Sequence, residues 1–223
     1  MAEEVEEEHF DPRTLLNDED DQKLHLFIKA GTDGRSKGAC PFCQDVFLKL
    51  LIKREADNEF CFDVITINYY LDSSYPSYKL SFDDPEALKI QSNVFKRFTY
   101  LIKDVHTDSQ TLLYELEKID KFLRERGTKY ISANRITGLD CSLWPKLQHI
   151  RVAANYILNL SIPVEFSALW NYLASAYELD AFVKSCPSDQ EIVLHWIRRE
   201  SSKEYLQLKK EEPRFSFEIP NRR

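Results

Sequence analysis

The sequence predicts a mostly helical α+β protein, and three observations support this fold class. Runs of β-branched and aromatic residues, which favour strands, gather before residue 70. A turn-like stretch with two prolines and paired aspartates follows over residues 71–85. Beyond it, over residues 85–208, apolar residues recur at helical spacing. We therefore expect a small α/β segment followed by an all-helical domain.

The first 23 residues form an acidic segment that we expect to be disordered. They hold ten acids against Arg13 and Lys23, so they cannot bury enough apolar surface to offset the entropy of ordering. This segment accounts for the formal net charge of -7, because the other charges of the chain nearly cancel. Neither a basic nucleic-acid surface nor an acidic body is indicated, and we expect no nucleic-acid partner.

The structured chain should begin in the order strand, helix, strand. Residues 24–29 alternate like a short strand, and a loop rich in Gly, Asp and Ser spans residues 31–38. Pro41 then takes the first helical position, where its missing N–H costs nothing, and the helix runs to about residue 56. Residues 60–67 form the second strand. The apolar positions of the helix are Phe47, Leu48, Leu51 and Ile52.

Two apolar stripes open the helical half, after a weaker strand candidate at residues 78–82. The first stripe consists of Leu88, Gln91, Phe95, Phe98 and Ile102. The second consists of Leu112, Leu116, Ile119 and Leu123. It ends before Gly127, which suits a helix C-cap.

Three capping boxes predict helix starts in this half. They pair Thr107 with Gln110, Thr137 with Asp140, and Ser188 with Glu191. Pro145 lies inside the helix that Thr137 would start, so we expect a kink or a late start there.

The N-terminal residues and the hydropathy of the chain indicate the cellular compartment that we expect. The opening residues, MAEEVEEEHF, contain no basic region and no apolar region, so no secretory signal is indicated and we expect a cytoplasmic protein. In the cytosol the five cysteines stay mostly reduced, which favours a catalytic, redox-sensing or metal-binding C-x-x-C over a structural disulfide. No stretch of about 20 predominantly apolar residues exists, so we expect a soluble native form.

The pair Cys40 and Cys43 is the candidate catalytic site. A thiolate at a helix N-terminus faces the positive end of the macrodipole, which lowers the thiol pKa below about 8.5. Cys40 would be the nucleophile, and Cys43, one turn later on the same face, would resolve the mixed disulfide. Lys37 adds a cation that helps the thiolate and contacts a substrate carboxylate, and Arg35 could act in the same way.

Two other interpretations of this pair stay open. The cysteines could be an inert pair at the helix start, or two ligands of a metal site, although zinc needs about four ligands and no second close pair exists. We expect no metal. Cys141, Cys186 and His149 are interpreted as core residues. The aromatic side chains interpreted as core packing are Trp144, Trp170, Tyr172, Tyr177 and Trp196.

Four segments carry a resemblance to known families. Residues 37–43, KGACPFC, resemble the glutaredoxin active site, in which the lysine contacts glutathione and the first cysteine attacks. Residues 26–40, LFIKAGTDGRSKGAC, resemble the opening of chloride intracellular channel proteins. Residues 140–152 and 181–192 are similar to later segments of the same family, particularly in invertebrate members.

This resemblance implies a domain organisation and a ligand. It implies a thioredoxin-like N-terminal domain over residues 24–84, an all-α glutathione-transferase-like domain over residues 85–208, and a tail over residues 209–223. Glutathione would be bound with the help of Lys37, Pro41 and Phe42. The resemblance also implies chloride as a transported ion and a membrane-associated form in contact with lipid. The family's proposed membrane segment would fall on about residues 40–67, which carry many charges.

The chain departs from the family pattern between residues 68 and 85. The family places further helices, strands and a cis-proline there, so the thioredoxin-like domain is expected to be shortened, with Tyr75–Pro76 as the nearest counterpart of the cis-proline. Our first hypothesis is a redox-responsive chloride intracellular channel-like protein that associates with membranes and supports chloride transport. The alternatives are a cytosolic glutathione-dependent thiol-disulfide oxidoreductase and a non-catalytic interaction protein.

Overall fold

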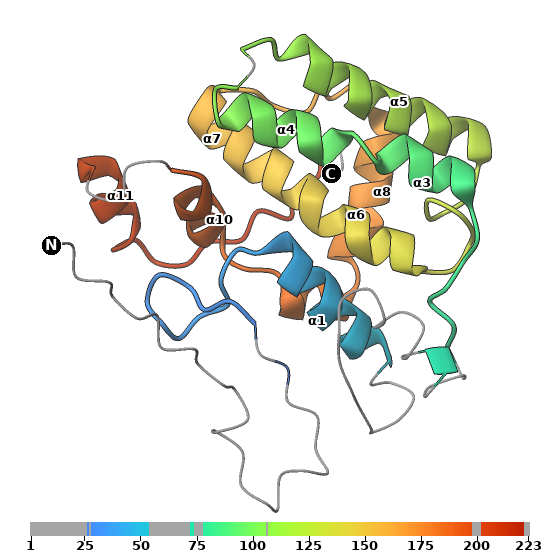
Figure 1. Cartoon of the computed structure of the whole chain (residues 1–223), viewed down its shortest axis with the longest axis horizontal. Coiled ribbons are helices and arrows are strands. Elements are labelled where there is room, and N and C mark those ends of the chain that lie inside the picture. Colours follow the sequence, from blue (N-terminus) through green and yellow to red (C-terminus); the bar gives the residue numbers. More distant parts are fainter. Residues whose placement is uncertain are drawn as a thin grey trace, which may run out of the picture.

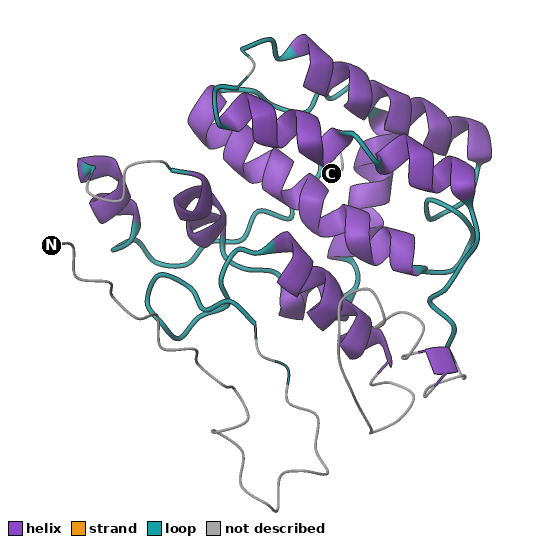
Figure 2. Cartoon of the chain, viewed as in Figure 1, coloured by secondary structure: helices purple, strands orange, loops and turns teal. Residues whose placement is uncertain are grey.

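The computed structural model describes residues 26, 28–53, 72–73, 78–105, 107–197 and 202–220. Three predictions fall outside these ranges: the acidic N-terminal segment, the second strand at 60–67, and the Tyr75–Pro76 peptide. In the described ranges, helices are joined by loops and no strand element is present (Figure 2). The prediction of a mostly helical chain is therefore confirmed.

Helices follow one another along the described chain (Figure 1). They are α1 (Pro41–Lys53), α3 (Pro85–Gln91), α4 (Val94–Ile102), α5 (Gln110–Arg126), α6 (Gly138–His149), the π-helix η3 (Ile150–Ala154), α7 (Asn155–Leu158), α8 (Ser167–Tyr177), α9 (Asp180–Ser185), α10 (Asp189–Trp196) and α11 (Lys203–Leu208).

One hydrophobic core unites α1 with the helices after residue 85. Ala39, Leu48 and Leu80 belong to the same buried cluster as the apolar residues of α4 to α10. α1 packs against α6 and α9, and α5 packs against α4 and α8 (Figure 1). The first turn of α1 therefore lies at the edge of the helical half, with α6 and α9 beside it.

The second apolar stripe forms the buried face of α5, as predicted. Leu112, Leu116, Ile119 and Leu123 are all buried. Gly127 ends the helix in the left-handed region at φ 64°, and its N–H donates to the Leu123 carbonyl. A side chain is strained in this conformation, so glycine suits the C-cap.

The predicted stripe from residue 88 to residue 102 is correct except at Leu88, because Gln91, Phe98 and Ile102 are buried and Phe95 packs against the core. The helix is interrupted after Gln91, and α4 begins at Val94. Phe98 in α4 is buried, whereas Leu88 in α3 is 58 % exposed.

Two of the predicted helix starts have clear outcomes. The Thr137 box is present: the Thr137 N–H donates to the Asp140 carboxylate at 2.7 Å and its hydroxyl donates to the same oxygen at 2.8 Å. The Thr107 box is wrong, because α5 begins only at Gln110. The Gln110 N–H donates to the Asp108 carboxylate at 2.9 Å, so a different side chain serves this helix start.

Pro145 neither delays nor ends its helix. α6 begins at Gly138, so the predicted late start is wrong, and Pro145 lies buried within it. The irregularity comes later: residues Ile150–Ala154 adopt a π-helix between α6 and α7. Backbone hydrogen bonds shifted by one residue are typical of such insertions, which often lie near functional sites.

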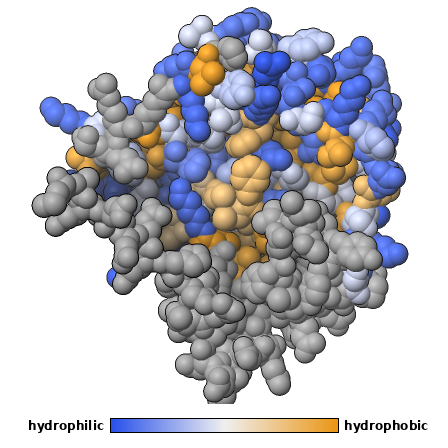
Figure 3. All heavy atoms as spheres, viewed as in Figure 1, coloured by the Kyte–Doolittle hydropathy of each residue, from blue (hydrophilic) through white to orange (hydrophobic). Residues whose placement is uncertain are grey.

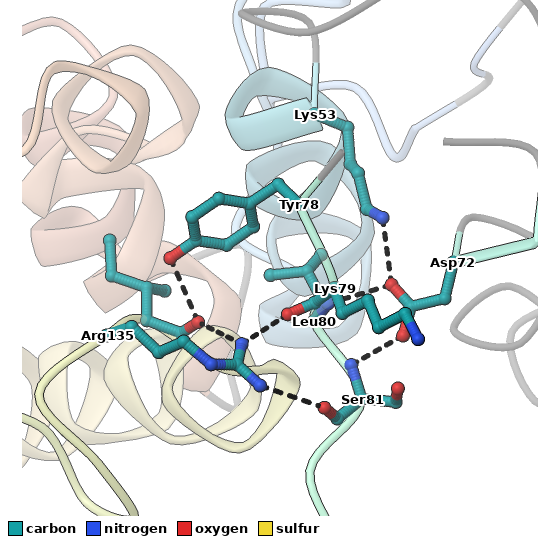
Figure 4. Close-up of polar contacts among 8 residues, drawn as sticks. Lys53, Asp72, Tyr78, Lys79, Leu80, Ser81 and Arg135 are labelled. Carbon is teal, nitrogen blue, oxygen red and sulfur yellow. Dashed lines mark hydrogen bonds and ion pairs between the residues drawn. The ribbon is translucent and has the colours of Figure 1, made fainter. Parts of the chain in front are cut away.

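The strand predicted at residues 78–82 is also wrong, and its polar contacts explain why (Figure 4). The Leu80 and Ser81 N–H groups donate to the Asp72 carboxylate at 2.7 and 2.6 Å, and Lys53 donates to the same carboxylate at 2.8 Å. The Leu80 carbonyl accepts from Gly138 N–H. These N–H and carbonyl groups already have hydrogen-bond partners in side chains and at the start of α6. They therefore need no partner in a neighbouring strand.

Arg135 completes this junction from the loop before α6 (Figure 4). Its guanidinium donates to the carbonyls of Lys79 and Ser81, and Tyr78 donates to the Ile136 carbonyl at 3.1 Å. Burial alone would raise the pKa of Asp72, but the hydrogen bonds from Lys53, Ser81 and Leu80 hold it below its usual value. The junction ties the end of α1 to the start of α6.

The strand predicted at residues 24–29 is not found in its described part. Leu26, Ile28 and Lys29 are outside any strand, and Ala30 makes only an isolated antiparallel bridge with Lys37. No helix within the described ranges is long and apolar enough to cross a membrane.

Candidate functional site

The loop before Cys40 is closed by its own backbone. Gly38 donates its N–H to the Lys29 carbonyl at 2.8 Å, next to the Ala30–Lys37 bridge. A Cβ added to Gly38 would lie 2.3 Å from the Ala30 carbonyl oxygen, which is shorter than any tolerated contact. Glycine is therefore required here by close backbone approach. We call residues 30–38 the pre-cysteine loop.

Asp33 organises the tip of the pre-cysteine loop. Its carboxylate accepts from the Arg35 and Ser36 N–H groups at 2.8 Å and from the Ser36 hydroxyl at 2.9 Å. These hydrogen bonds, with the one from Arg35 largest, hold the pKa of Asp33 below its usual value. Arg35 itself is exposed. The loop is thus a defined turn ending at the dithiol.

Glu191 of α10 fastens the pre-cysteine loop to the helical half. Its carboxylate oxygens each lie 3.0 Å from the Thr32 backbone nitrogen, and one accepts the Thr32 hydroxyl at 2.7 Å. The predicted Ser188–Glu191 box is therefore only half correct. Ser188 caps α10 by accepting from Glu191 N–H, but the Glu191 side chain reaches the loop. We call this contact the Thr32–Glu191 clamp.

Two lysines add contacts between the loop region and α9 and α10. Lys37 donates its ammonium to the Lys184 carbonyl in α9. Burial lowers the pKa of Lys37, and the Cys186 thiol acts in the opposite sense. Lys29 lies 3.3 Å from Nδ1 of His195 in α10. The Lys37 ammonium therefore donates to the protein backbone. The sequence predicts instead that it helps the Cys40 thiolate and contacts a substrate carboxylate.

Cys40 and Cys43 lie at the N-terminus of α1 as reduced, half-buried thiols. The Cys40 N–H donates to the Gly38 carbonyl at 2.9 Å, and the Cys40 carbonyl accepts the Gln44 N–H that opens the helix. Burial raises the pKa of Cys43; the Lys29 backbone lowers it and the neighbouring Cys40 thiol raises it further. The structure thus brings the two predicted cysteines together at one helix start.

Pro41 and Phe42 differ in their surroundings. Pro41 is buried at the first position of α1, as its missing N–H predicts. Phe42 is 54 % exposed, and its ring makes an edge-to-face contact with Phe95 of α4 at a centroid distance of 6.2 Å. The Lys146 ammonium lies 5.9 Å from the centre of the Phe42 ring. Figure 3 shows apolar side chains gathered across the middle of the face on which α1 begins.

The buried face of α1 is more polar than the sequence indicated. Leu48 is fully buried as expected, but Gln44, Asp45 and Lys49 are buried with it. The Lys49 ammonium lies 2.8 Å from the Asp45 carboxylate. Burial raises the pKa of Asp45, against the attraction of Lys49 and of Lys146 in α6. Sequence periodicity missed this pair because Asp45 and Lys49 are spaced like an exposed i, i+4 ion pair.

His149 lies in the aromatic core beside α10, as predicted. Its Nδ1 accepts from the Trp196 indole N–H at 3.0 Å, so the proton of the neutral ring is on Nε2. Burial, with His195 nearby, lowers the pKa of His149 to about 3. The aromatic residues predicted in the core are buried or packed against it: Trp144, Trp170, Tyr172, Tyr177 and Trp196.

The other described cysteines are core residues, as predicted. Cys141 and Cys186 are fully buried. Burial raises the pKa of Cys186 to about 12 and holds that of Cys141 well above its usual value. Within the described ranges, no three His, Cys, Asp or Glu side chains gather as a metal site.

A pocket of about 490 Å³ lies away from the dithiol. Its walls come from η3, α7, the loop after α7, α8, α10, α11 and the C-terminal segment, and include Arg151, Trp170 and Arg214. None of its lining residues belongs to the pre-cysteine loop or to α1. This pocket is therefore separate from the predicted Cys40–Cys43 site.

Solved structures place this fold in a known class. The crystal structure of the CLIC homologue EXC-4 from Caenorhabditis elegans superposes with a TM-score of 0.79 at 25 % identity, covering 89 % of this chain and 94 % of that one. A dehydroascorbate reductase from Chlamydomonas reinhardtii gives 0.65 at 23 % identity over 76 % of this chain and 94 % of that one. A trimeric glutathione transferase from Leishmania, TDR1, gives 0.57 at 19 % identity over 76 % of this chain and 49 % of that one. The fold is therefore glutathione-transferase-like.

Sequence relatives then define the family. Residues 22–74 match the model of the CLIC-like N-terminal domain. The chloride intracellular channel Clic of Drosophila melanogaster is 31 % identical over 235 residues, which cover 89 % of this chain and 90 % of that protein. The chloride intracellular channel exl-1 of Caenorhabditis elegans is 39 % identical over 142 residues, covering 61 % of this chain and 60 % of that protein. The chain belongs to the chloride intracellular channel family.

Proposed function

We propose that this chain is a redox-responsive member of its family whose Cys40–Cys43 pair exchanges disulfides with glutathione. The observation that carries the proposal is the position of the two half-buried thiols at one helix start, with Cys40 directly before α1 and Cys43 in its first turn. Free backbone N–H groups and the helix dipole favour a thiolate at this position. The raised pKa of Cys43 suits a thiol that stays protonated until the first step is complete.

The proposed reaction balances in two steps. The Cys40 thiolate attacks one sulfur of a disulfide that contains glutathione, forms a mixed disulfide and expels the other sulfur as a thiolate. Cys43 then loses its proton and attacks the Cys40 sulfur, which forms the Cys40–Cys43 disulfide and releases the second thiolate. The substrate disulfide is reduced to two thiols, and the protein dithiol is oxidised.

Some of the residues that would contact glutathione lie in the described part of the structure. Cys40 is accessible to a thiol, and Lys37 lies in the same loop as a cation for a carboxylate. The Lys37 ammonium has three donors, of which the Lys184 carbonyl takes one. Phe42, two residues after Cys40, adds an exposed ring at the start of α1. The Tyr75–Pro76 peptide, the expected counterpart of the family's cis-proline, lies outside the described residues.

The domain organisation belongs to this proposal. We assign residues 24–84 to a shortened thioredoxin-like domain and residues 85–208 to the glutathione-transferase-like domain. The match of residues 22–74 to the CLIC-like N-terminal domain supports the first assignment, and the continuous run of helices after Pro85 supports the second. The tail at 209–223 follows α11.

Trapping of the mixed disulfide tests the proposed exchange. We expect oxidised glutathione to convert the wild type to the Cys40–Cys43 disulfide, and to leave one glutathione on Cys40 in Cys43→Ser, both read by mass spectrometry. Cys61→Ser serves as the common background because it removes a thiol outside the described residues. If Cys43→Ser acquires no adduct at Cys40, Cys40 is not the nucleophile.

A second candidate function is membrane association with chloride transport. It is supported by the relatives, which are named chloride intracellular channels in Drosophila melanogaster and Caenorhabditis elegans. We propose a cytoplasmic form and a lipid-associated form, with the state of the dithiol governing the balance between them. Chloride efflux from liposomes should then rise with oxidised wild type and not with Cys40→Ala. Efflux equal to a protein-free control in every redox state would exclude this function.

A further inference from the structure

We infer that Glu191 of α10 is a positioning residue for the reactive cysteine, acting through the pre-cysteine loop. The inference rests on the proposed thiol exchange, because it assigns a partner to that same site. Three hydrogen bonds join Glu191 to Thr32, at 2.7, 3.0 and 3.0 Å. Thr32 and Glu191 lie 159 positions apart in the sequence. The clamp therefore links the loop directly to the helical half.

The loop transmits this position to the dithiol through its backbone. Gly31 follows the bridge residue Ala30 and donates to the Ser36 carbonyl at 2.8 Å. Gly38 donates to Lys29, and Cys40 donates to Gly38. These backbone bonds close the loop on both sides of Thr32 and end at Cys40. We therefore expect a displacement of Thr32 to change the position of the cysteine.

The surroundings of Glu191 indicate a fixed contact. A Cβ on Gly31 would lie 3.0 Å from the Glu191 Cδ, so the carboxylate packs against the loop backbone itself. Glu191 does not cap its own helix in return, although Ser188 supplies the hydroxyl of a capping box. A carboxylate bound to an N–H and a hydroxyl makes charge-assisted hydrogen bonds, which are about twice as strong as neutral ones. The Glu191 side chain therefore binds the pre-cysteine loop and not the start of its own helix.

The position of the pre-cysteine loop should affect the rate of disulfide exchange at Cys40. Lys37 and the half-exposed Cys40 approach a disulfide together only while the loop keeps its shape. Displacement of a reacting group by about 1 Å can slow a reaction by about 100-fold. Release of the clamp should therefore slow exchange with glutathione without unfolding α10, whose start Ser188 still caps.

Three variants test the inference in the Cys61→Ser background. Glu191→Met removes the acceptor at nearly constant length, Glu191→Gln keeps one acceptor oxygen, and Glu117→Met makes the matched change at an exposed site on α5. We expect the rate of exchange with oxidised glutathione to fall at least tenfold in Glu191→Met, to recover in part in Glu191→Gln, and to stay within twofold of wild type in Glu117→Met. The melting temperature is measured beside each rate.

A second readout needs no glutathione. Amide hydrogen exchange of Thr32 and of residues 34–38 should accelerate at least tenfold in Glu191→Met. The exchange rate should increase in the order wild type, Glu191→Gln, Glu191→Met. The amides of α10 should keep their protection. Unchanged loop protection, or equal rates for Glu191→Met and Glu117→Met, would overturn the inference. If the wild type does not exchange with glutathione, the proposed function fails, and loop protection together with iodoacetamide alkylation of Cys40 in Cys43→Ser still decides whether Glu191 positions the loop.

Discussion

The ammonium of Lys49 lies 2.8 Å from the carboxylate of Asp45, and both side chains are buried on the face of α1 that packs toward α6. A charge pair in this place is sensitive to the loss of either partner, because the remaining charge is left in a poorly solvated environment. The stability of the dithiol helix therefore depends on polar as well as apolar contacts with the helical half.

Removal of Lys49 should destabilise the protein strongly. We expect Lys49→Met to lower the free energy of unfolding by about 3 kcal/mol, because it removes the cation that lies 2.8 Å from the buried Asp45 carboxylate. Lys121→Met provides the control, since Lys121 pairs with Glu125 at 3.8 Å on the exposed side of α5 and should change stability by less than about 1 kcal/mol. Denaturant unfolding measures both. Equal effects would contradict the role of the buried pair.

The pH dependence of that variant has a definite sign. The pKa of Asp45 is raised in the folded state by burial, so the folded form holds a proton that the unfolded form releases. Stability therefore falls as the pH rises from the usual value of 3.8 through the folded pKa. We expect a steeper fall in Lys49→Met than in wild type, because the attraction that opposes the shift is gone. Unfolding curves collected from pH 3 to pH 8 measure this slope.

Acid should destabilise the protein through His149. Its pKa is lowered to about 3 in the folded state, from an ordinary value of 6.5, so protons bind the unfolded state preferentially as the pH falls below 6.5. This histidine alone should remove about 2 kcal/mol between pH 7 and pH 5. His149→Gln, whose amide oxygen can accept from Trp196, should lose that part of the pH dependence.

His195 provides the comparison for the acid effect. Its pKa is lowered to about 4, by burial and by Lys29 and Lys103, so it contributes in the same direction. Because it is more exposed, we expect His195→Gln to remove less of the pH dependence than His149→Gln. The reverse order would show that His149 is not the main acid-sensitive group.

Asp140 should be required for the helical half to fold. Its carboxylate accepts from Thr137, from the Ile131 N–H at 3.0 Å and from the Tyr172 hydroxyl at 2.9 Å. Asp140→Ala leaves these buried donors without their acceptor, and we expect a loss of about 3 kcal/mol or more. Thr107→Ala, at the predicted box that does not form, should change the melting temperature very little. A similar shift in both would contradict this assignment.

Two glycines of the pre-cysteine loop should respond differently to alanine. In Gly38→Ala the new methyl group would collide with the Ala30 carbonyl, so the loop must open next to Cys40. In Gly34→Ala the methyl group meets open space, and only the positive φ of 70° opposes it, at a cost of about 1 kcal/mol. The rate of iodoacetamide alkylation at Cys40 should change in Gly38→Ala and remain near wild type in Gly34→Ala.

The sequence predicted correctly those features that depend on residues close together in the chain. The α5 stripe, its Gly127 cap, the Thr137–Asp140 box and the start of α1 at Pro41 each depend on residues a few positions apart. The core positions of Trp144, His149 and Cys186 also followed from residue type and spacing. Such features survive folding because the tertiary structure does not oppose them.

The features that sequence could not predict depend on distant partners. Glu191 was assigned to its own helix start, yet Thr32 competes for its carboxylate from the other end of the chain. The strand pattern at residues 78–82 was overridden by Asp72 and Gly138, which take the backbone groups of Leu80. The C-x-x-C spacing at a helix start located the dithiol, and the family resemblance agreed with it, but neither indicated which helices hold its loop.

In the proposed exchange, Cys40 attacks the substrate disulfide and Cys43 resolves the mixed disulfide. The most direct test measures the rate at which the protein removes glutathione from a glutathionylated peptide, for wild type, Cys40→Ser and Cys43→Ser. We predict no activity above background in Cys40→Ser and reduced but measurable activity in Cys43→Ser, because the mixed disulfide on Cys40 can still be released by a second glutathione. Equal rates in the two variants would contradict the account.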